Sequence, residues 1–244
     1  MSTIYEVAKR AGVSTATVSR VLSRPDVVAP ETRKKVLQEV ERLGFTPNFV
    51  AANLRSFRTW KLLVTVPDIS NPFFSQILQG IEEAAQRRGY AVLLGDTQHD
   101  GKREERYATM LKRKEADGLI FLGHRLPKVA AELVRCMAPV CAPVVNGCEF
   151  SPTLGVPGVH IDNSGAAAEA MEHLYSLGHR RIGIVTGPLA SPLSVDRLHG
   201  TQACAKSHHA EDTLVVMTGD FSIASGFAAG EQLLDCKEPP TGVF

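Results

Sequence analysis

The sequence holds 244 residues, of which 44% are hydrophobic, so it can build more than one domain around a sizeable core. Its formal net charge is only +1, yet residues 1–61 carry 11 Lys and Arg against 5 Asp and Glu, whereas residues 62–244 carry 16 against 21. This asymmetry favours a polyanionic partner for the basic amino-terminal part, with a plain solvated surface as the alternative.

The residue patterns argue against several classes of protein. There is no secretion signal and no apolar run long enough to span a membrane, and the five cysteines have neither metal-site nor redox-motif spacing. The cysteines are interpreted as reduced thiols, which predicts a cytoplasmic protein. The eight histidines are scattered, and no P-loop or G-x-S-x-G motif occurs. We therefore expect neither an enzyme with catalytic residues nor a metal site or a cofactor.

The first sixty residues predict a helix-turn-helix followed by a third helix, an all-α module. Thr3 and Glu6 have the spacing of a capping box, and apolar residues then recur at helical spacing. Ser14 caps a second helix after a tight turn, and Pro30 opens a third helix that closes at Gly44. Three such helices can enclose one small core and leave the second helix partly exposed.

The exposed face of the second helix carries short hydroxyl side chains, an alanine and an arginine, namely Thr15, Ala16, Ser19 and Arg20. In the major groove of DNA, small hydroxyl residues let a helix backbone approach closely, and arginine can bind guanine O6 and N7 together. Ala16 offers only an apolar contact, such as one to a thymine methyl group. This pattern predicts a DNA-reading helix; a capped surface helix without a ligand is the alternative.

The module resembles the DNA-binding headpiece of the lactose-repressor/galactose-repressor family of transcription regulators, through the run TIYEVAKRAGVSTATVSRVLSRPDVVAPETRKKVLQEVERLGFTPNFVAANLRS. The resemblance implies that Thr15, Ala16 and Arg20 read bases. It implies backbone-contacting or supporting roles for Thr3, Tyr5, Ser14, Thr17, Ser19 and Thr32. These roles make double-stranded DNA the expected partner.

The resemblance also gives residues 47–60 a role as linker and hinge helix after a headpiece at residues 1–46. In the family this helix pairs with its dimer mate in the minor groove, where Asn48, Leu54 and Arg55 are expected here. Leu54 matches the leucine that wedges between base steps. A flexible tether with an incidental leucine is the alternative reading, because so short a helix is marginal alone.

From Lys61 onward, strand-like apolar runs alternate with helical patterns, which predicts an α/β fold of parallel sheets covered by helices. The expected strands are 62–66, 91–94, 118–122, 144–145, 158–161, 182–185 and 214–217, and a further buried strand begins at 241–244. Ligands of such folds lie outside the carboxyl ends of the strands.

These segments resemble the two-lobed, periplasmic-binding-protein-like effector domain of the same family, through runs such as VPDISNPFFSQILQGIE, GYAVLLGD and LGHRRIGIVTGP. The resemblance implies a first lobe at residues 61–162 and a second at 163–244. Phe73 and Phe74 follow a strand and could stack on a planar base, although aromatic residues there are often core. Arg197 and Phe221 match effector-contacting positions of the family.

The resulting hypothesis is a repressor that binds a palindromic operator as a homodimer and is controlled by a small molecule. Segments such as VPDISNPFFS and CEFSPTLGVPGVHIDN resemble cytidine-responsive members, which implies a nucleoside effector. A solute-binding module with the same lobes and a non-functional truncated repressor are the alternatives. Because the family pattern continues past Phe244, both lobes are expected to be partial, with exposed sheet edges and a tendency to aggregate.

Overall fold

The computed structural model describes residues 2–46, 58–136, 143–149 and 152–244. The chain divides into two compact units, Met1–Arg58 and Thr59–Phe244, and each is described by itself. Among the described residues, no helix is both long and apolar enough to cross a membrane.

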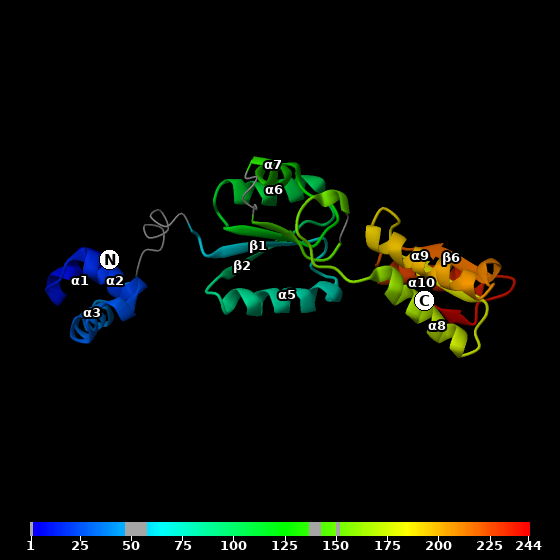
Figure 1. The fold of residues 1–244 in the computed structure, drawn as a ribbon, viewed down its shortest axis with the longest axis horizontal. Coiled ribbons are helices and arrows are strands. Elements are labelled where there is room, and N and C mark those ends of the chain that lie inside the picture. The colour runs from blue at the N-terminus through cyan, green and yellow to red at the C-terminus, as the bar shows by residue number, and fades with distance from the viewer. Residues whose placement is uncertain (1, 47–57, 137–142, 150–151) are drawn as a thin grey trace. The chain divides into compact units, whose positions relative to one another are not determined.

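The first unit is the predicted headpiece of three helices joined by tight turns (Figure 1). Its elements are α1 (Ile4–Ala11), α2 (Thr15–Ser23), the short 3₁₀ turn η1 (Pro25–Val27) and α3 (Pro30–Arg42). The expected capping box is present at the start of α1. There the Thr3 hydroxyl accepts the Glu6 N–H at 3.3 Å, and the Glu6 carboxylate accepts the Thr3 N–H at 3.1 Å.

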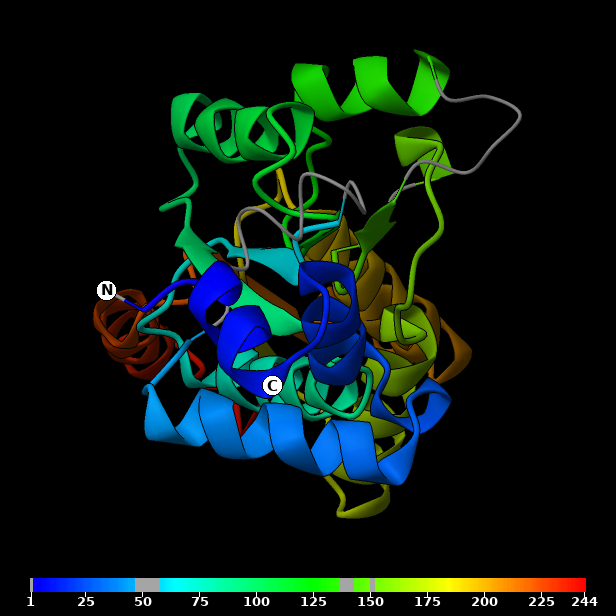
Figure 2. The same cartoon turned by 90° about the vertical axis from the view of Figure 1, so that its left-hand side faces the viewer.

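One apolar cluster holds the headpiece together, and Figures 1 and 2 show α1 and α2 against one side of α3. Its buried members come from all three helices and are Val7, Ala8, Val18, Val21 and Val36. Burying each valine fully stabilises the fold by about 1.5–3 kcal/mol. Because these apolar residues recur at helical spacing, they lie on one face of each helix, and their burial directs that face toward the core.

The second unit begins with a parallel four-stranded sheet in the order β2-β1-β3-β4. Its strands are β1 (Lys61–Val66), β2 (Ala91–Asp96), β3 (Gly118–Phe121) and β4 (Val144–Asn146). The accompanying helices are α5 (Pro72–Gln86), α6 (Gly101–Lys112), α7 (Lys128–Cys136) and the 3₁₀ turn η2 (Pro152–Leu154). Figure 1 shows α6 and α7 on one face of this sheet and α5 on the other.

Alternation along the strands explains how this sheet is covered on both faces. Leu119 and Phe121 of β3 pack in the cluster that faces α6 and α7, whereas Ile120 and Leu122 pack with Phe74 of α5. Successive side chains of a strand point to opposite faces, so a continuous apolar run is required where both faces are buried. The two residues before β1 are held by the Asp117 carboxylate, which accepts the N–H and hydroxyl of Thr59 and the N–H of Trp60.

A parallel three-stranded sheet follows, in the order β6-β5-β7. Its strands are β5 (Ile182–Thr186), β6 (Leu214–Thr218) and β7 (Gly242–Val243), and its helices are α8 (Asn163–Ser176), α9 (Pro192–Ser207), α10 (Ile223–Leu234) and the 3₁₀ turn η3 (Glu211–Thr213). Ile182 and Ile184 face the cluster formed with α8 and α9, whereas Gly183 between them lies under Leu233 of α10.

One expected strand does not form, and another is less buried than expected. Residues 158–161 form no strand, only an isolated bridge between Gly158 and Asn146, and Val159 is 71% exposed. The neighbouring strand β4 is only three residues long and ends at Asn146. Gly158 pairs with this last residue, and the chain that follows Gly158 then leaves the edge of the sheet. The expected strand at 241–244 forms as β7, but only Gly242 is buried, and Val243 is 55% exposed.

Helices α8 and α9 approach each other unusually closely at Gly200. A Cβ atom at this position would lie 2.1 Å from the backbone oxygen of Ser164 on α8. Such a separation is well inside van der Waals contact, and the obstructing atom belongs to a helix backbone rather than to a side chain that can rotate away. Glycine is therefore required at residue 200 for this packing.

We predict that Gly200→Ala destabilises the second unit by about 1–3 kcal/mol, because the two helices must separate to admit the methyl group. Gly226→Ala is the matched control, since Gly226 lies in α10 with no atom within 4 Å of the added carbon. Alanine favours helix there by up to about 1 kcal/mol. Urea unfolding followed by the fluorescence of Trp60 would measure the stability of both variants. An unfolding midpoint of Gly200→Ala equal to that of the unmodified chain would contradict the close contact.

Candidate DNA and effector sites

The start of α2 is ordered by two hydroxyl groups. The Ser14 hydroxyl accepts the Thr17 N–H at 3.1 Å, and the two hydroxyl oxygens lie 2.9 Å apart. Serine is among the residues preferred as helix caps because it satisfies an otherwise unpaired N–H. These bonds anchor the helix end that the sequence analysis assigned to DNA, and the Ser14 side chain remains at the exposed surface.

The predicted base-reading residues share one side of α2. Ala16 and Arg20 are exposed and lie four residues apart, and Thr15 is half-buried beside them. Val18 and Val21 on the opposite side are buried in the headpiece core. Helix α2 contains no acidic residue, so nothing on it opposes the approach of phosphate groups.

The predicted backbone-contacting residues also lie in the headpiece. Tyr5 is 74% exposed, whereas Ser19 and Thr32 are half-buried. The hydroxyl of Thr3 accepts a hydrogen bond as a helix cap and keeps its own proton for donation. The predicted hinge residues Asn48, Leu54 and Arg55 lie outside the described residues.

A cleft of about 420 Å³ opens in the second unit at the carboxyl ends of the strands. Its lining consists of residues that follow β1, β2, β4, β5 and β6, namely Asp68, Asn71, Phe73, Phe74, His99, Glu149, Leu193, Arg197, Asp220, Phe221 and Ser222. The structure therefore brings all four side chains named from the sequence, Phe73, Phe74, Arg197 and Phe221, into one cleft.

The turn between β1 and α5 shapes the first wall. The Asp68 carboxylate accepts the hydroxyl of Ser70 at 2.7 Å and its N–H at 2.8 Å, and these bonds lower the pKa of Asp68. The side-chain oxygen of Asn71 accepts the Phe73 N–H at 3.0 Å and caps α5. A rigid turn thus places the two phenylalanines at the edge of the cleft.

The two phenylalanines differ in their surroundings. Phe74 is 5% exposed and packs with Val66 and Leu122, as the core alternative expected, whereas Phe73 is 47% exposed. Their rings meet edge-on, with centroids 5.2 Å apart and an angle of 72°. Phe74 therefore supports Phe73, and Phe73 offers the larger free aromatic surface.

Arg197 on α9 is oriented by a buried amide. Its Nε donates to the side-chain oxygen of Asn163 at 2.9 Å, and the Asn163 amide nitrogen donates to the Ile161 carbonyl at 3.3 Å. Asn163 is 4% exposed, so its position is well determined by packing. Among the described residues, the other guanidinium N–H groups of Arg197 have no protein acceptor, which leaves them for a ligand in the cleft.

Phe221 lies at the turn after β6 with φ of +68°, a region that non-glycine residues seldom occupy. Its ring lies against Gly187, where a Cβ atom would be 2.0 Å from the ring. The carboxylate of the preceding Asp220 accepts the Ser222 N–H at 2.9 Å, and hydrogen bonding with Ser222 and Ser225 lowers the pKa of Asp220 to about 2. The turn is thus held by an ionised carboxylate, and the ring is 47% exposed toward the cleft.

Sequence reasoning missed several polar residues of the lining, above all Glu149. The Glu149 residue is 5% exposed, and one oxygen of its carboxylate lies 2.8 Å from His124 Nδ1. Burial and the neighbouring carboxylate raise the pKa of Cys148 to about 11. The available signal was positional, because Glu149 comes three residues after β4, where parallel sheets bind ligands.

The comparisons with known proteins cover both units. The description "Bacterial regulatory proteins, lacI family" matches residues 3–48, and "Periplasmic binding proteins and sugar binding domain of LacI family" matches residues 59–243. The chain is 41% identical to the HTH-type transcriptional repressor CytR of Escherichia coli strain K12 over 244 residues, covering all of this chain and 71% of CytR.

Two further relatives agree with this result. Catabolite control protein A of Priestia megaterium is 36% identical, with 99% of this chain and 73% of that protein covered. The crystal structure of the Lac repressor dimer bound to operator and the anti-inducer ONPF superposes with a TM-score of 0.85 at 26% identity, over 99% of this chain and 72% of that one. The chain therefore belongs to the LacI family of bacterial regulatory proteins, with a helix-turn-helix headpiece and a periplasmic-binding-protein-like effector domain.

Proposed function

We propose that this LacI-family repressor binds a palindromic operator as a homodimer and responds to a nucleoside such as cytidine. The observation that carries the effector assignment is the single cleft that gathers Phe73, Arg197 and Phe221 with several carboxyl groups. The solved Lac repressor dimer bound to operator is the precedent for the assembly, at 26% identity. The domain division proposed here follows the sequence, with headpiece 1–46, hinge 47–60 and lobes 61–162 and 163–244.

In the headpiece, Arg20 is proposed as the main hydrogen-bonding base reader. It is exposed on the same side of α2 as Ala16, whose methyl group lets the helix lie close to the bases. The hydroxyls of Ser14, Thr17 and Ser19 are proposed to contact phosphates and so fix the register of the helix. Leu54 in the hinge is proposed to wedge between base steps.

In the cleft, the proposed nucleoside stacks its base on the exposed rings of Phe73 and Phe221. The exocyclic amine of cytosine donates a hydrogen bond, which a carboxylate such as that of Glu149 accepts. Arg197 donates hydrogen bonds to the ribose oxygens. Three carboxyl side chains line the cleft against one guanidinium group. This balance disfavours a phosphorylated effector, because the negative phosphate would face Asp68 and Asp220.

The proposed effector acts by shifting a population. A ligand that binds better at one angle between the lobes shifts the protein toward that conformation and so changes its affinity for operator. Operator binding changes the affinity for the ligand by the same factor. A sugar is the second candidate effector, since one matching family description includes a sugar-binding domain. Arg197 and the carboxyl groups suit the hydroxyls of a sugar, but the exposed aromatic rings favour a ligand with a planar face.

For DNA reading, we predict that Arg20→Ala abolishes discrimination at one base pair of the operator, at a cost of about 1–3 kcal/mol. Gel shifts of the full chain with operators selected from a palindromic pool, each with one base pair changed, would measure this at two salt concentrations. Arg87→Ala, just after the carboxyl end of α5, is the matched control, because it removes the same charge from an exposed residue of the second unit. Equal loss across all operator variants would reassign Arg20 to a phosphate contact.

For the effector, we predict that cytidine binds with measurable heat whereas ribose alone does not, because the base supplies the stacking contact. Phe221→Leu should weaken cytidine binding by about 0.5–1.5 kcal/mol through loss of that contact. Phe227→Leu is the control, since Phe227 is 69% exposed and lies outside the cleft lining. Titration calorimetry would decide between the effectors, and comparable affinity for ribose would favour a sugar.

A further inference from the structure

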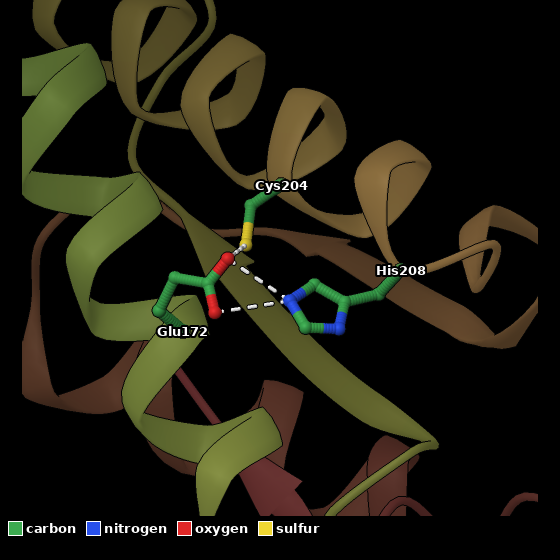
Figure 3. A group of neighbouring side chains, drawn as sticks. All are labelled: Glu172, Cys204 and His208. Carbon is green, nitrogen blue, oxygen red and sulfur yellow. Dashed lines mark hydrogen bonds and ion pairs between the residues drawn. The ribbon is translucent and has the colours of Figure 1, made fainter.

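The second unit contains a cluster of potential metal ligands away from the cleft lining, and Figure 3 shows how its members face one another. The cluster consists of Glu172 on α8, Cys204 on α9 and His208 at the carboxyl end of α9. No metal site was expected from the sequence, because neither the cysteines nor the histidines match a known metal-binding motif. Cys204 and His208 nevertheless stand four residues apart, which puts both on one side of a helix.

The distances within the cluster are close to those around a small metal ion. One ligand atom from each residue lies within 4.8 Å of the others. His208 Nε2 is 2.9 and 3.0 Å from the two Glu172 oxygens, and Cys204 Sγ is 3.5 Å from Oε1. A tetrahedral zinc ion binds sulfur and nitrogen at about 2.0–2.3 Å, so its ligand atoms lie roughly 3.3–3.8 Å from one another. Small side-chain rotations therefore suffice to surround an ion.

The fold holds each ligand in place. The close packing of α8 and α9 at Gly200 brings Glu172 opposite Cys204, and α9 presents Cys204 with its side chain 6% exposed. The His208 imidazole stacks on the ring of Tyr175, with centroids 4.3 Å apart and an angle of 21°. The ring stacking limits rotation of the imidazole and keeps Nε2 directed at the carboxylate.

A second observation supports a ligand at this place. Tyr175 is 4% exposed, and its hydroxyl has no hydrogen-bond partner among the described residues. A buried hydroxyl without a partner is destabilising, and a water bound to an ion beside the ring would offer it a partner.

We propose that Glu172, Cys204 and His208 form a binding site for one zinc ion, with water as the fourth ligand. Thiolate, imidazole and carboxylate are the ligand types that zinc prefers in proteins, and an open fourth position is common. Glu172 and His208 are exposed, so an ion can enter from solvent.

Binding of the ion follows a simple proton balance. Without metal the Cys204 thiol donates to Glu172, and burial raises the pKa of Cys204 to about 11. On binding, the zinc–sulfur bond replaces the sulfur–hydrogen bond and the thiol proton passes to solvent. His208 Nε2, which donates to Glu172 without metal, gives up its proton, and the neutral imidazole then carries its one N–H at Nδ1. Thiolate and carboxylate together then neutralise the charge of the zinc ion.

A zinc ion at this site would join α8 to the carboxyl-terminal part of α9. Arg197, which lies in the cleft lining, is seven residues before Cys204 on the same helix. Zinc is therefore expected to stabilise the helix pair that carries Arg197. Zinc binding itself does not depend on the proposed effector, so failure of either proposal leaves the other intact.

The test uses the full chain, purified without a histidine tag and stripped of metal. Titration with Co²⁺ as a probe of the zinc site should saturate at one equivalent, with the near-ultraviolet absorption of a cobalt–thiolate bond. Competition against a coloured chelator would then measure Zn²⁺ affinity. Saturation without a thiolate band, or no binding at all, would overturn the proposal.

Three variants and three matched controls locate the site. We predict that E172Q, C204S and H208Q each weaken Zn²⁺ binding by about tenfold or more. The matched controls E169Q, C136S and H209Q should bind as the unmodified chain does, because Glu169, Cys136 and His209 are exposed and lie outside the cluster. Equal affinity in H208Q and H209Q would overturn the assignment.

A stability measurement guards against misfolding of the variants. Glu172 and His208 are exposed, so E172Q and H208Q should retain the circular dichroism spectrum of the unmodified chain. Zn²⁺ should raise the thermal midpoint of the unmodified chain and of H209Q but not of H208Q. An equal zinc-induced shift in H208Q would place the ion elsewhere and contradict the proposed site.

Discussion

The close contact between α8 and α9 at Gly200 is the constraint on which most of the carboxyl-terminal part depends. With no side chain at residue 200, the helix can lie against the backbone oxygen of Ser164. This approach places Asn163 at the start of α8 within hydrogen-bond distance of Arg197, toward the cleft. Further along the same helix pair it sets Glu172 against Cys204. The absence of a side chain at Gly200 therefore affects both the orientation of Arg197 in the cleft and the distance between Glu172 and Cys204 in the proposed metal site.

A second constraint arises from parallel strands. Because parallel strands all end at the same edge of a sheet, the turns that follow them converge, and polar residues from distant parts of the sequence meet there. Asp68, Glu149 and Asp220 come from turns after three different strands and line one cleft. Asp68 and Asp220 also accept hydrogen bonds from serines within their own turns, so these carboxylates shape the wall as well as charge it.

The headpiece differs from the second unit because almost all of its contacts join residues that are close in the sequence. Its core joins residues within about thirty positions of one another, and its helix starts are set by Thr3 and Ser14, each bonded to an N–H three residues later. The headpiece is accordingly a compact unit of its own, and the residues proposed to read bases depend on contacts within it.

The sequence by itself determined the elements whose signals are local. The capping box at Thr3, the cap at Ser14, the opening of α3 at Pro30 and most strands were predicted because they depend on neighbouring residues or short periodicities. Among the proposed effector residues, Phe73 was predicted from its place after a strand, and Arg197 and Phe221 from resemblance to a family. Only the fold placed all three in one cleft. Tertiary structure alone decided the exposure of Val159, the burial of Glu149, and the meeting of Glu172 with Cys204 and His208. These outcomes depend on which elements pack together across many residues, and no local pattern encodes that choice.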